Sequence, residues 1–289
     1  MLFIFACGSE FEQETIHPEQ TPIDALMNNV FEAHGELGNY SFDFRDNSYT
    51  FSYNNANEYT YSKTVITDST LTVDVLTNDL FERSTNGVPQ ALDQLESDKY
   101  SESLNSVIYF TCSPLNLSDP AVNIVLKPDV TIKAQGYDVI EVRFDAEGGG
   151  TDHDDVFYYW FNKETHIMDY MAYSYNVNGG GVRFRSAYNS RMVAGMRFQD
   201  YVNYGAPVGT PLENLPGLFE QGELDELSRI ECNNKVCDKK INPLKDIRTT
   251  KSSYIVKNLI QDDLKFTLIF FQYLKKGICK NIIFNKCSY

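Results

Sequence analysis

The densest group of side chains that could do chemistry lies in one glycine-rich segment, residues 147–155. Its five potential ligands are Glu147, Asp152, His153, Asp154 and Asp155. Carboxylate oxygens bind Ca²⁺ and other divalent ions, but the segment lacks the D-x-D-x-D-G order of a calcium loop. Its glycines could form an anion-binding nest, although four acids would repel an anion. We predict a hairpin loop with solvated carboxylates and no metal or cofactor.

Two arginines follow a second glycine run at Gly179–Gly181. Arg183 and Arg185 alternate along the segment that comes next, so both face the same side of a strand. Both glycine runs are expected at strand ends, where the two loops can lie side by side. We therefore expect Arg183 and Arg185 to form ion pairs with the acids of residues 147–155.

Cys7 points to a different chemistry, the attachment of lipid. It ends the run Met1–Cys7, in which apolar residues and Ala6 precede the cysteine, as at the end of a bacterial lipoprotein signal. A complete signal has a basic n-region and a longer apolar h-region. We therefore predict a truncated lipoprotein signal with lipidation at Cys7; the alternative is a buried N-terminal strand. Residues 8–21 are polar and acidic, as expected of a flexible tether.

The charge is divided unevenly along the chain. The net charge is −15, yet residues 233–289 hold 12 basic and 4 acidic residues, which leaves 13 basic and 36 acidic residues in 1–232. Such an acidic body would repel nucleic acid. The basic tail could bind an anionic membrane, and its cysteines could bind zinc, although their spacing is not that of a zinc site. We interpret residues 233–289 as a non-native or disordered extension.

The body, residues 22–232, is predicted to be one mainly β domain of the α+β type. Thr21, Pro22 and Asp24 are typical of a helix start, apolar residues follow at helical spacing, and Gly35 predicts a left-handed C-cap. Strict alternation then predicts an antiparallel meander from Tyr40 to Val75.

The second half of the body continues this pattern after one interruption. Residues 95–117 fit a helix that Pro114 ends. A short helix is expected at 215–221 and a last strand at 225–232. Further strands are predicted near 137–145, 155–162, 167–176, 181–187 and 192–203.

One hairpin carries a resemblance to a known family. The segment Val156–Tyr170 (VFYYWFNKETHIMDY) resembles the aromatic hairpin of the outer-membrane lipoprotein carrier, or LolA/LolB-like, superfamily. Glu32–Gly35, which follows an amphipathic helix and precedes aromatic strands, resembles the same group.

A closer resemblance is to an uncharacterised family of Gram-negative lipoproteins, from about Cys7 to Ile230. It rests on residues 105–110 (NSVIYF), 144–150 (FDAEGGG), 154–157 (DDVF) and 177–185 (VNGGGVRFR). Some members are labelled deoxyribose-phosphate aldolase. That label implies a parallel (β/α)₈ barrel with a Schiff-base lysine, which an antiparallel meander does not fit.

The carrier resemblance implies an antiparallel curved sheet, or half-open β-barrel, with the N-terminal and mid-chain helices packed on its concave side. An apolar cavity between sheet and helices would hold an acyl chain, because burying apolar surface is favourable. The alternative is that these rings are ordinary core. The candidate cavity residues are Tyr40, Phe42, Phe44, Tyr59, Tyr61, Phe157, Tyr159 and Tyr173.

Catalysis has little support in the sequence. The chain has four histidines, and it contains no nucleophile elbow, phosphate loop or dinucleotide fingerprint. Cys112, within the predicted mid-chain helix, is expected to be a small core residue. We therefore predict a lipid-anchored protein of the cell envelope, at the outer membrane, that binds a lipid or other apolar ligand. The alternatives are a structural or assembly lipoprotein that binds a protein partner and, less favoured, an enzyme.

Overall fold

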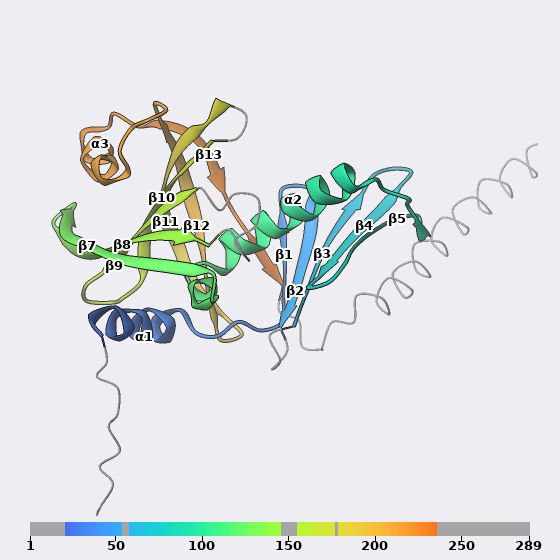
Figure 1. Ribbon diagram of the computed structural model, residues 1–289, viewed down its shortest axis with the longest axis horizontal. Coiled ribbons are helices and arrows are strands. Elements are labelled where there is room, and N and C mark those ends of the chain that lie inside the picture. Colours follow the sequence, from blue (N-terminus) through green and yellow to red (C-terminus); the bar gives the residue numbers. More distant parts are fainter. Residues whose placement is uncertain (1–20, 54–57, 146–154, 177–178, 236–289) are drawn as a thin grey trace, which may run out of the picture.

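The computed structural model describes residues 21–53, 58–145, 155–176 and 179–235. Two seven-stranded antiparallel sheets and three α-helices make up this part of the chain (Figure 1). The N-terminal sheet contains β1 (Tyr40–Phe44), β2 (Asn47–Tyr53), β3 (Tyr59–Ile66), β4 (Leu71–Thr77), β5 (Phe81–Thr85), β6 (Val88–Pro89) and β14 (Asn233–Lys235). The C-terminal sheet contains β7 (Val122–Ile132), β8 (Gln135–Phe144), β9 (Val156–Asn162), β10 (Met168–Tyr175), β11 (Gly181–Val193), β12 (Met196–Ala206) and β13 (Asp225–Ile230).

The topology is a simple meander in both sheets. The strand order is β14-β1-β2-β3-β4-β5-β6 in one and β13-β12-β11-β10-β9-β8-β7 in the other. β13 lies at the edge of the C-terminal sheet, and β14 pairs with β1 at the edge of the N-terminal sheet. The last described segment therefore links the sheets, and the paired chain extends three residues beyond the predicted domain end at Cys232.

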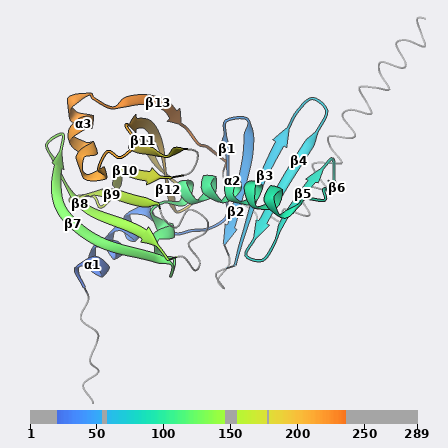
Figure 2. The ribbon, with the colours of Figure 1, turned by 45° about the horizontal axis from the view of Figure 1, so that its top comes forward.

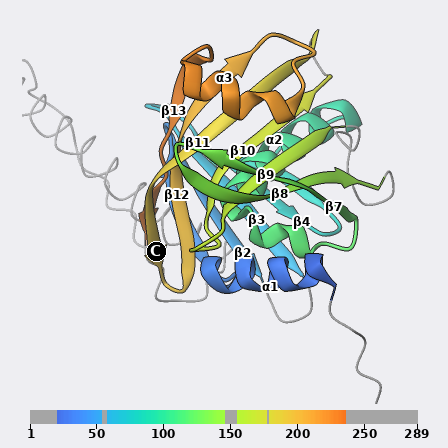
Figure 3. The same cartoon turned by 90° about the vertical axis from the view of Figure 1, so that its left-hand side faces the viewer.

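The helices α1 (Pro22–His34) and α2 (Gln94–Cys112) pack on the inner faces of the sheets. α2 lies across the N-terminal sheet and reaches the C-terminal sheet at its carboxyl end (Figure 2). α1 and α3 (Leu215–Gln221) lie toward opposite ends of the C-terminal sheet (Figure 3). The prediction of curled antiparallel sheet with the two longer helices on one side is thus confirmed.

Three clusters of buried residues follow from this arrangement. One unites α1 with the inner face of the C-terminal sheet, and a second unites α2 with β1, β2 and β3. The third lies on the outer face of the C-terminal sheet, where Leu215 of α3 and Leu212 of the short 3₁₀ helix η3 (Leu212–Asn214) cover Trp160 and Phe184. The C-terminal sheet is therefore covered on both faces, an arrangement that the sequence prediction did not include.

The ends of α1 show why this helix forms where it does. The Thr21 hydroxyl accepts a hydrogen bond from the Asp24 amide at 3.2 Å, while the Asp24 carboxylate accepts from the Thr21 amide at 3.1 Å. This capping box satisfies two amides that the helix itself leaves free. Gly35 has the expected positive φ of 85°, but its ψ of −141° lies outside the left-handed helical region. The reason is that Gly35 forms a β-bridge with Met196.

The observed strands include β5, β6 and β7, which the sequence did not predict, and they differ from the predicted boundaries at residues 192–203. The predicted strand 192–203 contains a tight turn instead, because Ala194 and Gly195 both have positive φ, at 48° and 96°. β11 therefore runs on to Val193, and β12 begins at Met196. The predicted helix at 95–117 is α2, and a separate 3₁₀ helix, η1 (Leu115–Ser118), follows Pro114. All strand pairs in the described ranges are antiparallel, which excludes a parallel (β/α)₈ barrel for them.

Gly35 gives a direct test of how α1 is joined to the C-terminal sheet. A Cβ atom at this position would lie 1.9 Å from the Gly195 carbonyl oxygen. Gly35→Ala should therefore lower the free energy of unfolding by roughly 3 kcal/mol or more, measured by chemical denaturation.

Gly217→Ala in α3 is the matched control. A Cβ atom there has its nearest neighbour at 4.0 Å, and alanine favours a helix over glycine by up to about 1 kcal/mol. Equal stabilities of the two variants would contradict the close approach of Gly35 to the turn.

Candidate functional site

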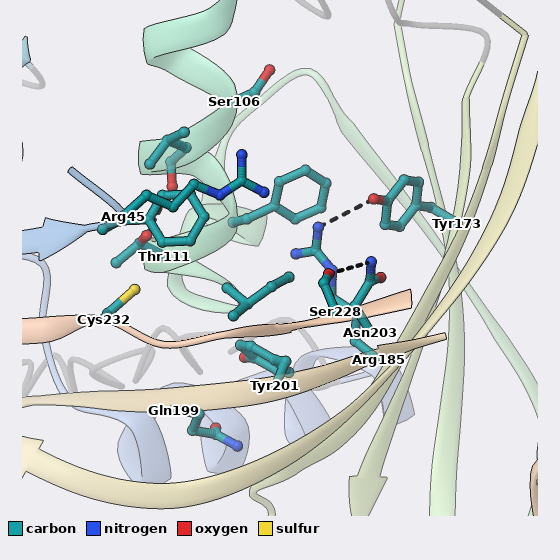
Figure 4. A pocket seen from close by; sticks show the side chains of 14 residues that line it. Arg45, Ser106, Thr111, Tyr173, Arg185, Gln199, Tyr201, Asn203, Ser228 and Cys232 are labelled. Atoms are coloured by element: carbon teal, nitrogen blue, oxygen red, sulfur yellow. Dashed lines mark hydrogen bonds between the residues drawn. The ribbon is translucent and has the colours of Figure 1, made fainter. Parts of the chain in front are cut away.

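A cavity of about 300 Å³ lies beneath the carboxyl half of α2, where the two sheets meet. Side chains from α2, the β1–β2 turn and the inner face of the C-terminal sheet form its wall (Figure 4). The lining residues are Phe44, Arg45, Ser106, Val107, Phe110, Thr111, Tyr173, Arg185, Gln199, Tyr201, Asn203, Ser228, Ile230 and Cys232. Seven of these side chains are apolar or aromatic and seven are polar, so the cavity combines apolar surface with several polar groups.

Two of the eight predicted cavity residues line this space, namely Phe44 and Tyr173. The other six lie on the same inner faces but do not line it. Four of them belong to strands of the N-terminal sheet and pack in one cluster with α2: Tyr40, Phe42, Tyr59 and Tyr61. The other two, Phe157 and Tyr159, belong to the cluster beneath α1. The eight rings thus lie on inner faces of the sheets, and six of them are packed core beside the cavity.

The remaining cavity walls follow a periodicity that could have been found in the sequence. Every second residue of one segment of β12 lines the cavity, namely Gln199, Tyr201 and Asn203. The same holds for Ser228 and Ile230 of β13 and for Cys232, which follows it. Tyr201 pairs with Ile230 across the two strands. These residues alternate on the inner side, as the pleat requires. The sequence prediction selected aromatic residues only, so it missed the polar and aliphatic members of this set, and it did not select Tyr201.

Four of the predicted polar-loop residues lie outside the described residues, namely Glu147, Asp152, His153 and Asp154. Asp155 directly precedes β9 and is half-buried. Among the described residues, no ion pair forms at Arg183 or Arg185. Within the described part, each arginine donates to a tyrosine of β10, Arg183 to Tyr175 at 2.6 Å and Arg185 to Tyr173 at 3.1 Å, and the pairing with residues 147–154 stays a prediction.

Arg185 is the charged group at the centre of the cavity wall. Arg185 is only 7% exposed, and its guanidinium carbon lies 4.1 Å from the centroid of the Phe110 ring. The hydrogen bond to Tyr173 uses Nη2, while the buried Nε has no partner. Figure 4 shows the guanidinium of Arg45 extending toward the same space from the other side.

A buried histidine lies behind the cavity. Gln199, on the cavity wall, donates to the Met168 carbonyl at 2.8 Å, and the Met168 amide donates to Nε2 of His34 at 3.2 Å. Nδ1 of His34 lies 2.7 Å from the Val30 carbonyl. Both contacts are satisfied by a neutral imidazole protonated on Nδ1. Burial lowers the pKa of His34 to about 4, so this residue is a neutral link between α1 and β10.

The two cysteines in the described part of the chain are buried thiols. Cys112 is fully buried in α2, and Cys232 lies at the cavity wall with 9% exposure. Burial raises the pKa of Cys232 to about 11 and that of Cys112 further. Both therefore stay protonated at neutral pH, and neither has the low pKa of an activated nucleophile. In the ranges that the structure describes, no cluster of three or more His, Cys, Asp or Glu side chains could hold a metal ion.

The fold and the site together define a mainly antiparallel β-protein with a partly open, apolar cavity beneath a helix. Residues 30–232 match a family described as "Family of unknown function (DUF6503)". Because the match covers more than half of the chain, the protein belongs to this family. The matched range contains every residue that lines the cavity.

One solved structure provides a further comparison. The fold is similar to that of a "putative outer membrane lipoprotein-sorting protein domain from Vibrio parahaemolyticus", with 8% identity and a TM-score of 0.34. The alignment covers 78% of this chain and 97% of that chain. No curated protein matches the chain significantly. The resemblance to lipoprotein carriers that was drawn from the hairpin stays a prediction.

The neutral state of His34 predicts a dependence of stability on pH. Its pKa is about 4 in the folded protein and 6.5 in the unfolded chain, so the unfolded state binds the extra proton first. The free energy of unfolding should therefore fall as the pH is lowered from 6.5 to 4. The contribution of His34 to this loss is about 3 kcal/mol at most.

Comparison with His34→Gln isolates that contribution from those of the carboxylates. The wild-type protein should lose more stability than the variant between pH 6.5 and 4, measured by urea denaturation at each pH. Parallel curves for the two proteins would show that His34 does not titrate with the expected shift.

Proposed function

We propose that this is a lipid-anchored protein of the cell envelope whose cavity binds an apolar small molecule, such as an acyl chain. The observation that carries the proposal is the cavity between α2 and the two sheets. Phe44, Val107, Phe110 and Ile230 give it apolar walls, and Tyr173 and Tyr201 add rings with a polar end. Burial of an alkyl chain against such walls is favourable by roughly 25 cal/mol per Å².

The size of the cavity restricts the ligand. A volume of about 300 Å³ is at the lower end of the range for small-molecule sites. This space suits one alkyl chain better than a lipid with two or three. The cavity is also partly open beside α2, where exposed Ser106 lies at its edge. A chain can therefore enter without separation of the two sheets.

The proposed location rests on Cys7 and the polar tether that follows it. A lipid at Cys7 would hold the domain close to a membrane surface, where amphiphiles are concentrated. Among the described residues, no helix has the length and apolar character required to cross a membrane. Cys7 alone supports the proposed membrane association through an acylated cysteine.

A protein partner is the second candidate function, and an exposed strand favours it. β7 is at the edge of the C-terminal sheet, and its Val125 and Leu126 are 53% and 42% exposed. An unpaired edge with apolar side chains can accept another strand. This surface is separate from the cavity, so occupancy of the cavity distinguishes the two functions. We propose no catalytic reaction for either.

Ligand binding can be tested on the full-length protein. After mild purification, native mass spectrometry should show a bound amphiphile at about one per chain. Val107→Phe and Ser106→Trp add volume at the cavity wall and should reduce occupancy severalfold, because a filled cavity excludes the chain.

Ser103→Trp is the matched control. Ser103 lies one turn earlier on α2, is exposed and does not line the cavity, so occupancy should equal that of the wild-type protein. Absence of any bound small molecule, together with recovery of a stoichiometric protein partner, would favour the β7 surface instead. Unchanged occupancy in both filling variants would place the ligand elsewhere.

Lipidation makes a separate prediction. The wild-type protein, expressed in a Gram-negative host behind a complete export signal, should fractionate with membranes. Cys7→Ala should move most of it to the soluble fraction, because the acylated residue is lost. Mass spectrometry of the N-terminal peptide should show diacylglycerol on Cys7. An unmodified Cys7 in membrane-bound protein would contradict the anchor while leaving the cavity proposal intact.

A further inference from the structure

Arg185 places a positive charge where an apolar pocket alone would not need one. Burial of a guanidinium is unfavourable unless it is paired, because the charge loses its hydration. Arg185 is only 7% exposed, yet no carboxylate among the described residues forms an ion pair with it. Its Nε has no hydrogen-bond partner. The side chain, which lies in the cavity wall, thus retains unused donor capacity.

The composition of the cavity wall agrees with this view. Among its 14 lining residues are two arginines, Arg45 and Arg185, and no aspartate or glutamate. This is unusual for a chain with 40 acidic and 25 basic residues. The wall therefore concentrates positive charge in a protein that is strongly negative overall. A neutral ligand would leave that charge unpaired.

The partners of Arg185 fix its position. Its guanidinium lies on the Phe110 ring of α2, at 4.1 Å, and donates to the Tyr173 hydroxyl at 3.1 Å. These contacts hold the planar group in the same cavity wall as the apolar side chains of Phe44, Val107 and Ile230. A planar, fixed guanidinium matches the two oxygens of a carboxylate.

We propose that Arg185 binds the carboxylate of a single-chain amphiphile, such as a fatty acid, with the alkyl chain along the apolar walls. Arg45, which extends toward the cavity from the other side, adds a second positive charge to its wall. This inference rests on the proposed function and names its ligand class. It gives the ligand one anionic end and one alkyl chain, a combination that fits the volume and the charge of the site.

A matched pair of arginines makes the proposal testable. Arg183 and Arg185 lie two residues apart on β11, and each donates to a tyrosine of β10. Only Arg185 lines the cavity. Arg185→Met therefore removes a guanidinium group from the cavity wall, whereas Arg183→Met removes one that does not line the cavity. Arg185→Lys keeps the charge but removes the planar pair of donors.

Binding to the full-length protein is measured by titration calorimetry with dodecanoate, dodecanol and acetate. The wild-type protein should bind dodecanoate more tightly than dodecanol, and acetate very weakly. Arg185→Met should weaken dodecanoate binding roughly tenfold or more, as expected for loss of a charged hydrogen bond, and leave dodecanol within about twofold. Arg185→Lys should give an intermediate affinity, and Arg183→Met should match the wild-type protein.

Several results would overturn the proposal. Equal binding of dodecanoate and dodecanol, or an Arg185→Met affinity equal to that of the wild-type protein, would leave an apolar site without a carboxylate function. Acetate binding as tight as that of dodecanoate would indicate a site for a free anion. Failure of both long-chain probes to bind would overturn the proposed function itself. If Arg185→Met does not fold by circular dichroism, Arg185→Lys and Tyr173→Phe provide the comparison, and unchanged dodecanoate binding in both is the contradicting result.

Discussion

The packing of α2 against two differently oriented sheets is the constraint on which the site depends. Leu104, Ile108 and Cys112 recur at every fourth position and are fully buried against the N-terminal sheet. This stripe fixes the rotation of the helix about its axis. The neighbouring positions 106, 107, 110 and 111 must then face the region where the sheets meet. One helix cannot fill that region, and the unfilled volume is the cavity.

The junction of the sheets is maintained from two directions. On one side, Gly35 bridges to Met196, and the Glu36 amide donates to the Gly195 carbonyl at 3.2 Å. On the other, the segment after β13 crosses to pair with β1 as β14. Between these links, Cys232 is close to both a cavity wall and the N-terminal core. Both links connect the two sheets beside the cavity, and α2 forms a further part of its wall.

The elements of the fold were predictable where local chemistry decides them. Thr21, Pro22 and Asp24 locate the start of α1, and Pro114 locates the end of α2, because caps and proline act on their own backbone. β7 was missed because Pro128 and charged residues interrupt its alternation, as an edge strand permits. The turn at Ala194 and Gly195 was missed because alanine rarely adopts positive φ.

The site was less predictable than the fold for a physical reason. Alternation tells which residues share a face, but a cavity is what the packing of distant elements leaves unfilled. Phe44 and Phe42 illustrate this difference, because they lie two residues apart on one face of β1. Phe42 is fully buried in the core, whereas Phe44 borders the cavity. Sequence separation alone could not show that Arg185 has Phe110 and Tyr173 as neighbours, while its pairing with acids of residues 147–155 stays a prediction.

The contrast between the acidic chain and the basic cavity has a consequence for how an anion would bind. A net charge of −15 repels anions at long range, so the field of the whole protein does not favour their capture from solution. Screening at physiological salt limits this repulsion to about 8 Å, whereas a pair formed inside the cavity is screened much less. Arg185 would therefore act at short range, on a ligand already close to the mouth beside α2. The proposed membrane anchor at Cys7 would provide that proximity, because amphiphiles in an adjacent bilayer would need only a short transfer to reach the cavity.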